Sequence, residues 1–287
     1  MLSKDKRAEL VQQIHALGVC KGDIILVRGD LGSIGRISGI KRPDFVSIFL
    51  DAIGQKGTLV GLAFTGSNYL KKDKSKVFDK TSKSTSGAFS NAMLAYPNAK
   101  RSSHPSNSFV AIGPNADFIL KDHDIHASCY EPIRKLLYLK GKMIVFGCVD
   151  SSPGFTTTHL VEEDLGIDKR IIFPWLSTCY YRRSDNSIGL YRRKQVGGCS
   201  STFYKFYKFY KESEALRQGF FGDSYSICID ATDAYRIEKK ILEGDSKFNI
   251  CNSQGCTLCR ARRWDNIKDI PKFYARKIAR KFLKYKE

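Results

Sequence analysis

The sequence lacks any apolar run long enough to cross a bilayer, any internal repeat and any low-complexity tract. The first absence excludes a helical membrane-spanning protein, and the other two exclude repeat arrays and compositionally biased chains. The segment MLSKDKRAEL is too charged for a signal peptide. We therefore expect a cytoplasmic protein whose 287 residues form one large domain or two small ones.

Acidic residues are outnumbered, because 29 Asp and Glu stand against 48 Lys and Arg, a formal net charge of +19. A field of this sign attracts anions, so nucleic acid, anionic lipid and a phosphorylated small molecule are candidate partners. Much of the excess lies in the last segment, PKFYARKIARKFLKYKE. Hydrophobic residues make up 42% of the chain, which is enough for a sizeable core.

Helix and strand patterns alternate over the first 65 residues. Ser3 can cap a first helix, and Pro43 fits the first position of a second one. Apolar strands are expected at 23–27 and 57–64, each after one of these helices. The alternation predicts an α/β layer fold with at least some parallel pairing.

The rest of the chain continues this pattern. Strands are expected at 108–112 and 142–149, whereas the basic residues 66–85 predict an exposed loop or lid. No convincing linker precedes residue 245. We therefore expect one domain at 1–245 and a basic, cysteine-rich appendage packed on it at 246–287.

Two polar segments adjoin predicted strands: one follows the strand at 23–27, and the other precedes the strand at 108–112. The loop DLGSIGRIS has glycines at 29, 32 and 35 that let backbone N–H groups turn toward a phosphate, although a glycine-rich turn without a ligand also explains it. The segment RSSHPSNS offers Arg101 and His104 as polar groups, although taken alone it is explained by an ordinary loop.

The segment TTTHLVEED comes just after a predicted strand. His159 and Glu162 are three residues apart, so on a helix they share a face and form a base with its orienting carboxylate. The alternative is a plain helix start with acidic residues in its first turns.

Three segments, taken in order, resemble the aminoglycoside 3-N-acetyltransferase family: GDIILVRGDLGSIGRISG, RSSHPSNSFVAIG and VFGCVDSSPGFTTTHLVEED. The resemblance covers roughly residues 5–250. It implies a layered α/β/α fold with a mixed sheet and transfer of an acetyl group from acetyl-CoA to an amine. Arg28, Gly29 and Asp30 depart from the family, which usually has a histidine and serines there.

The resemblance also implies site residues. CoA contacts are expected from Leu31, Gly32, Ser33, Ile34, Gly35, Arg36, Arg101, Ser102 and Ser108. His159 and Glu162 form the expected catalytic pair, and acceptor contacts are expected from Thr65, His104, Thr156 and Glu163. In this interpretation His159 removes a proton from the acceptor amine, and Glu162 orients it or binds the ammonium.

The positive field suggests that the acceptor carries phosphate, so we expect acylation of a nucleotide-linked amino sugar for surface polysaccharide, with acetyl or another short acyl group. The alternative is an aminoglycoside, as in antibiotic resistance. A more distant alternative is a basic nucleic-acid-binding protein with a zinc site, although the sequence has no nucleic-acid-binding signature. The sequence does not indicate the oligomeric state.

Three C-terminal cysteines, Cys251, Cys256 and Cys259, have the spacing C-x4-C-x2-C. The C-x2-C pair is a common half-site for zinc, with Cys199 as the first choice of fourth ligand and Cys228 as the second. An iron–sulfur cluster and free thiols are the alternatives. The basic tail after them predicts an amphipathic helix that packs on the domain or touches anionic lipid.

Overall fold

The computed structural model describes residues 2–66, 68–69, 75–168, 177–193, 199–261 and 268–283. The strands are β1 Ile24–Gly29, β2 Thr58–Leu62, β3 Asn68–Tyr69, β4 Val77–Phe78, β5 Lys100–Arg101, β6 Phe109–Ile112, β7 Lys142–Phe146, β8 Ser177–Arg182, β9 Ile188–Arg192, β10 Arg217–Phe221 and β11 Ser224–Asp230. The α-helices are α1 Lys4–Ala16, α2 Arg42–Ile53, α3 Ala88–Leu94, α4 Ala116–Leu120, α5 Glu131–Tyr138, α6 Thr157–Asp164, α8 Tyr207–Glu212, α9 Ala231–Gly244, α10 Thr257–Ala261 and α11 Asp269–Leu283. Two 3-10 turns, η1 Leu31–Ser33 and η2 Phe203–Phe206, complete the elements.

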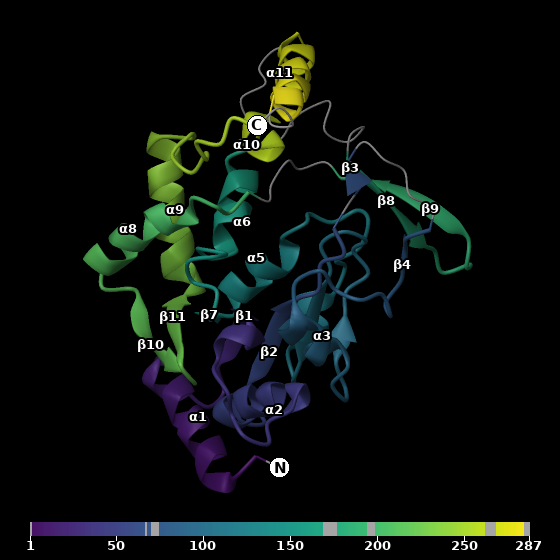
Figure 1. Cartoon of the computed structure of the whole chain (residues 1–287). Coiled ribbons are helices and arrows are strands. Elements are labelled where there is room, and N and C mark those ends of the chain that lie inside the picture. The colour runs from purple at the N-terminus through teal and green to yellow at the C-terminus, as the bar shows by residue number, and fades with distance from the viewer. Residues whose placement is uncertain are drawn as a thin grey trace.

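A mixed sheet of seven strands forms the centre of the molecule (Figure 1), in the order β10-β11-β7-β1-β2-β6-β5. The central strand β1 pairs in parallel with β2 and β7, and the outer pairs are antiparallel. The predicted mixed sheet with some parallel pairing is confirmed.

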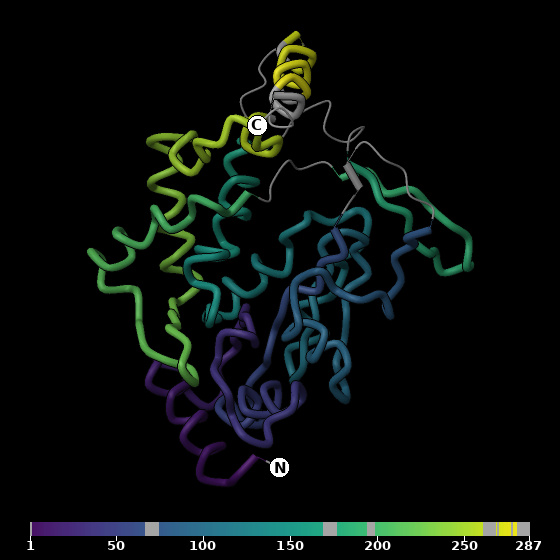
Figure 2. The backbone as a smooth tube through the Cα atoms, viewed as in Figure 1, coloured from purple at the N-terminus to yellow at the C-terminus, as the bar shows by residue number. Residues whose placement is uncertain are grey.

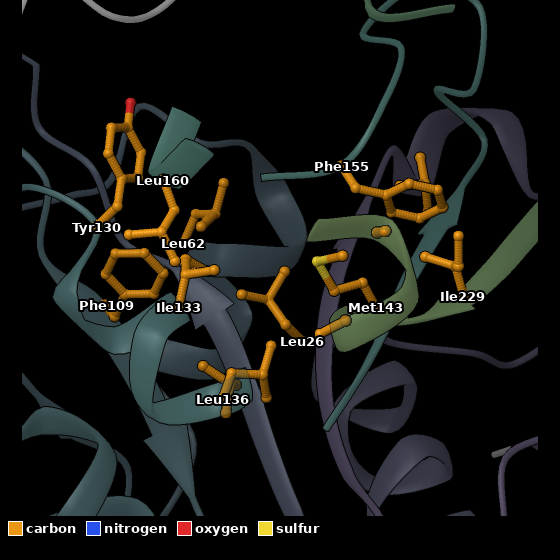
Figure 3. Packing of buried hydrophobic residues seen from close by; sticks show 14 of the residues in the cluster. Leu26, Leu62, Phe109, Tyr130, Ile133, Leu136, Met143, Phe155, Leu160 and Ile229 are labelled. Atoms are coloured by element: carbon orange, nitrogen blue, oxygen red, sulfur yellow. The ribbon is translucent and has the colours of Figure 1, made fainter. Parts of the chain in front are cut away.

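The sheet is buried on both faces, because alternate residues of each inner strand enter different hydrophobic clusters. Ile25 and Val27 of β1 pack with residues of α1, α2 and α3. Leu26 packs on the opposite face with residues of α5, α6, α8 and α9. Figure 3 shows side chains of this second cluster, among them Leu26 from β1 and Met143 from β7. The predicted α/β/α layering is therefore confirmed.

Local signals explain where the first helices begin and end. The Ser3 hydroxyl accepts a hydrogen bond from the backbone N–H of Lys6 at 3.2 Å and caps α1. Gly18 and Gly54 follow α1 and α2 with φ angles of 84° and 65°, which glycine adopts without strain. The predicted helix starts at Ser3 and Pro43 fall within one residue of the observed ones.

A second, four-stranded sheet was not expected from the sequence. It joins β3, β8 and β4, with β9 paired to β8, and the hairpin of β8 and β9 extends away from the body of the molecule (Figure 2). The prediction that residues 66–85 form only a loop is wrong, because β3 and β4 come from this segment. Residues 67 and 70–74 of that segment lie outside the described residues.

The C-terminal segment returns to the body of the molecule before it ends in α11. Thr202 donates a hydrogen bond to the carbonyl of Asn249 at 2.7 Å, which ties residues beyond 245 to the turn before α8. The predicted basic tail helix is present as α11, where the side chain of Ile278 is 57% exposed. The boundary at 245 and lipid contact stay predictions. Within the described residues, no helix is long and apolar enough to cross a membrane.

Candidate active site

A cleft of about 860 Å³ opens where the parallel strands β1, β2 and β7 end. Asp30, Phe64 and Cys148, which follow these three strands, contribute to its lining. The loop before α3, the start of α6 and the turn after Cys199 line other parts of it. Carboxyl ends of parallel strands are where open α/β sheets place their ligands, so this cleft is the candidate active site.

His159 lies in this cleft on α6, with its ring held on two sides. Its Nδ1 is 2.9 Å from Oε2 of Glu162, one helical turn further on. The ring of Tyr130 stacks on the imidazole with centroids 5.0 Å apart, and the ring of Phe203 lies at the same centroid distance. A carboxylate accepts the Nδ1 proton, so the neutral ring keeps a lone pair on Nε2. The predicted pair therefore has the geometry of an oriented base.

Glu162 is buried behind His159 and is itself held by a third residue. The residue is 2% exposed, and its Oε1 accepts a hydrogen bond from Nδ2 of Asn249 at 2.6 Å. This location contradicts the expectation that Glu162 binds the substrate ammonium, and it leaves Glu162 the role of orienting His159. Sequence reasoning did not find Asn249, which lies 87 residues away from Glu162.

Thr156, the residue before α6, also faces the cleft. Its side chain is 3% exposed, and its Oγ1 has no hydrogen-bond partner within the described part of the chain. A buried hydroxyl without a partner costs free energy unless a ligand satisfies it. The acceptor contact expected from Thr156 stays a prediction.

Four cysteines form a cluster beside the cleft. The Sγ atoms of Cys199, Cys251, Cys256 and Cys259 all lie within 4.8 Å of one another. The first choice of fourth residue, Cys199, joins the other three, whereas Cys228 is buried in β11. Ser200, Thr257 and Leu258, the neighbours of cluster members, line the cleft.

Residues 26–243 match the sequence model of the family described as aminoglycoside 3-N-acetyltransferase. The chain belongs to this family. A curated aminoglycoside N(3)-acetyltransferase III from Salmonella sp is 29% identical over 173 residues, which are 54% of this chain and 59% of the relative. The chain therefore spans about three fifths of the length of this relative.

Two solved structures of aminoglycoside acetyltransferases have the same fold as this chain. The aminoglycoside acetyltransferase AAC(3)-IVa, as apoenzyme, superposes with a TM-score of 0.76 at 23% identity and covers 91% of this chain and 97% of that one. AAC-IIIb in a binary complex with CoASH gives a TM-score of 0.70 at 22% identity, over 83% of this chain and 96% of that one.

The expected acceptor contact from His104 is contradicted by its burial. Its side chain is 0% exposed, its Nδ1 accepts a hydrogen bond from the Asn107 N–H at 3.0 Å, and its Nε2 lies 3.1 Å from the Tyr191 hydroxyl. Burial lowers the pKa of His104 well below 6.5, so the ring stays neutral. His104 is a structural residue that supports the loop before β6.

Glu163 and Thr65 do not line the cleft either. Glu163 accepts a hydrogen bond from the hydroxyl of Ser128 on another side of α6. Thr65 donates its hydroxyl proton to the carbonyl of Pro105 at 2.5 Å. Both side chains are bonded within the protein, and the acceptor contacts expected from them stay predictions.

Arg101, Ser102 and Ser108 bond to neighbouring segments of the protein and do not line the cleft, and the CoA contacts expected from them stay predictions. The Arg101 guanidinium is buried and donates to Oγ of Ser108 at 3.0 Å and to the carbonyl of Ala63 at 2.6 Å. Ser102, also buried, accepts from the N–H of Phe109 at 2.9 Å. Burial lowers the pKa of Arg101 to about 10, and the side chain ties the end of β2 to the segment before β6.

The glycine-rich loop after β1 lies at the rim of the cleft. Asp30 accepts hydrogen bonds from the N–H of Gly32 and the hydroxyl of Ser33, both at 2.9 Å. The backbone N–H of Gly32, which was expected to face a phosphate, therefore donates to the Asp30 carboxylate instead. Ile34 is 0% exposed, which contradicts a CoA contact by its side chain. The CoA contacts of the other five residues stay predictions: Leu31, Gly32, Ser33, Gly35 and Arg36.

Arg28 is a cleft residue that sequence reasoning recorded only as a departure from the family. Its guanidinium donates to the carbonyls of Ser152 at 2.6 Å and Gly154 at 3.1 Å, while its buried Nε has no partner within the described residues. Arg193 lines the same cleft. Within the described lining the permanent charges are thus two arginines and the carboxylate of Asp30.

Proposed function

We propose that this chain is a CoA-dependent N-acetyltransferase that acetylates an amine of an aminoglycoside. The observation that carries the proposal is the line of hydrogen bonds from Asn249 through Glu162 to Nδ1 of His159 at the cleft. Family membership and the CoASH complex of AAC-IIIb support acetyl-CoA as the donor. The names of the curated relatives favour an aminoglycoside over the nucleotide-linked amino sugar of our main sequence hypothesis.

In the proposed reaction, the amine nitrogen attacks the thioester carbonyl while Nε2 of His159 takes a proton from that nitrogen. The new C–N bond forms, the C–S bond breaks, and CoA leaves with the electron pair of that bond. Glu162 stabilises the imidazolium that forms, since its carboxylate is 2.9 Å from Nδ1. The imidazolium then returns the proton to the CoA sulfur, which balances the reaction as amide plus free thiol.

Thr156 is the proposed acceptor contact closest in sequence to the base. The residue lines the cleft, and its buried hydroxyl, which has no partner within the described residues, could bond a hydroxyl or amine of an acceptor that displaces the side chains around it. A site that bonds a substrate hydroxyl also selects against analogues that lack it, because its own polar group would be left unpaired.

One observation favours a second candidate acceptor, an amino sugar that carries phosphate. Arg28 and Arg193 outnumber the carboxylate of Asp30 in the described lining. A lining with this balance attracts a phosphate and repels a polycation. The nucleotide-linked amino sugar therefore remains the second candidate.

Steady-state kinetics with a panel of acceptors tests the proposal. Thiol release from acetyl-CoA is followed with several aminoglycosides and several nucleotide-linked amino sugars, and each product is checked by mass for one added acetyl group. A kcat/KM for aminoglycosides that exceeds the other class by at least about 10-fold supports the main proposal. A ratio of the same size in the other direction replaces it with the second candidate.

A further inference from the structure

Four thiols from two distant segments meet in one small cluster. Cys199 comes from the turn before η2, whereas Cys251, Cys256 and Cys259 come from the segment after α9 and from α10. None of the four forms a disulfide, and their Sγ atoms lie within 4.8 Å of one another. The backbone N–H of Cys251 points at the Sγ of Cys259 at 3.3 Å, a donor that stabilises a thiolate.

The spacing fits one tetrahedral metal ion. A Zn–S bond of about 2.3 Å places tetrahedral sulfur atoms about 3.8 Å apart, which the observed limit accommodates. An iron–sulfur cluster inserts several iron atoms between its thiolates and needs a wider arrangement. Four thiolate ligands are typical of structural zinc, because they leave no open position for substrate.

The cysteine cluster is joined to the active site through Asn249. The Thr202 hydroxyl, three residues after Cys199, donates to the Asn249 carbonyl at 2.7 Å. The Asn249 amide, two residues before Cys251, donates to the Glu162 carboxylate at 2.6 Å.

The same segments also form a wall of the cleft. Ser200 follows Cys199, and Thr257 and Leu258 lie between Cys256 and Cys259; all three line the cleft. Any ion held by the four thiols would therefore fix both this wall and the residue that holds Glu162.

We propose that Cys199, Cys251, Cys256 and Cys259 bind one zinc ion, and that this ion holds Asn249 and the adjoining cleft wall in position. The ion closes a loop of about fifty residues between Cys199 and Cys251, and such closure lowers the conformational entropy of the unfolded chain. The metal takes no part in the reaction. This proposal goes beyond the proposed function and does not depend on it.

Metal analysis of the full chain, purified without chelators under reducing conditions, is the direct test. We expect one zinc per chain, retained in Cys20→Ser and lost in Cys256→Ser. Cys20 is the matched control because it is exposed and lies outside the cluster. Iron in place of zinc, no metal in protein with reduced cluster thiols, or zinc retained by Cys256→Ser would each overturn the proposal.

A second measurement avoids any folding defect of the variant. Wild-type protein is stripped of metal with a chelator and titrated with Co²⁺ and then with Zn²⁺. We expect the visible bands of tetrahedral cobalt thiolate to saturate at one equivalent and to disappear when zinc is added. Absence of these bands in chain that refolds, as judged by circular dichroism, would refute the site.

The coupling to the active site has its own readouts. Stripped protein is expected to unfold at a lower temperature and to lose acetyl transfer, and one equivalent of zinc should restore both. If transfer is absent even with zinc, the proposed function fails while the metal and unfolding data still decide the zinc site. A stripped protein with unchanged unfolding temperature and unchanged turnover would contradict the positioning role.

Discussion

Replacement of Glu162 by glutamine should disable His159 without removing it. Glutamine has the shape of glutamate but presents one oxygen and one NH₂ group. Asn249 donates to Oε1 of Glu162 at 2.6 Å, so the glutamine oxygen must face Asn249 and its NH₂ group must face Nδ1 of His159. Nδ1 then accepts, the ring proton moves to Nε2, and the nitrogen in the cleft loses the lone pair that a base needs.

The size of the effect follows from the role of the base. A positioned general base contributes about 10² to 10⁴ in rate, which corresponds to about 3 to 5 kcal/mol of activation free energy. We therefore expect Glu162→Gln to lower kcat by about 10² to 10⁴ while KM changes by less than about threefold. The fold should survive, because the substitution replaces a buried charge with an amide of the same size.

A double variant separates this explanation from general damage. In Glu162→Gln with Asn249→Asp, the aspartate accepts from the glutamine NH₂, so the glutamine oxygen can again accept the Nδ1 proton of His159. The double variant should therefore recover at least about tenfold of the lost kcat, whereas Asn249→Asp alone should be impaired by two facing carboxylates. Steady-state kinetics on all four proteins, with unfolding temperatures as the control, measures the cycle. Wild-type kcat in Glu162→Gln, or no recovery in the double variant, would refute the tautomer argument.

Two further predictions concern Thr156, at the start of α6, and Glu238 of α9, which accepts a hydrogen bond from Thr158 of α6. Thr156→Val removes the unpartnered hydroxyl of this cleft residue, and we expect kcat/KM for the preferred acceptor to fall about 2- to 10-fold while CoA binding is unchanged. Steady-state kinetics would measure the first quantity and calorimetry the second. An unaltered kcat/KM would exclude a substrate contact. Burial raises the pKa of Glu238 to about 8, so the folded chain binds more protons than the unfolded chain between pH 4.5 and 8 and loses stability as the pH rises through that range. The loss in unfolding free energy is a few kcal/mol, about 5 at most. Glu238→Gln should abolish this pH dependence and still accept the hydrogen bond that Thr158 donates at 2.8 Å. Denaturant unfolding at pH 5 and pH 8 tests this, and an equal pH dependence of the unfolding free energy in wild type and variant would contradict it.

Features that depend on a few neighbouring residues were predicted well from the sequence. The cap at Ser3, the prolines and glycines at helix ends, and the apolar strands gave the layered fold, because each of these signals acts over a few neighbouring residues. His159 and Glu162 were found because their three-residue spacing places them together on any helix. The cysteine cluster was found because thiols are rare enough that their spacing carries information.

Features that depend on tertiary packing were missed or misassigned. Asn249 carries no local signal, since its meaning comes from Glu162, 87 residues away. Arg101 and His104 lie in a polar segment before a strand. The sequence of such a segment does not show whether its side chains contact a ligand or form hydrogen bonds within the protein, as these two do. The second sheet was missed because β3 and β4 are two residues long, too short for a periodic pattern.

The most direct test of the central claim compares acetyl transfer by wild type, His159→Ala and His126→Ala, with the acceptor that the panel selects. His126 is exposed and does not line the cleft, so it is the matched histidine control. The account predicts that His159→Ala lowers kcat by at least about 10² with CoA still bound, while His126→Ala keeps the wild-type rate. Equal turnover in His159→Ala and wild type would contradict the assignment of His159 as the base.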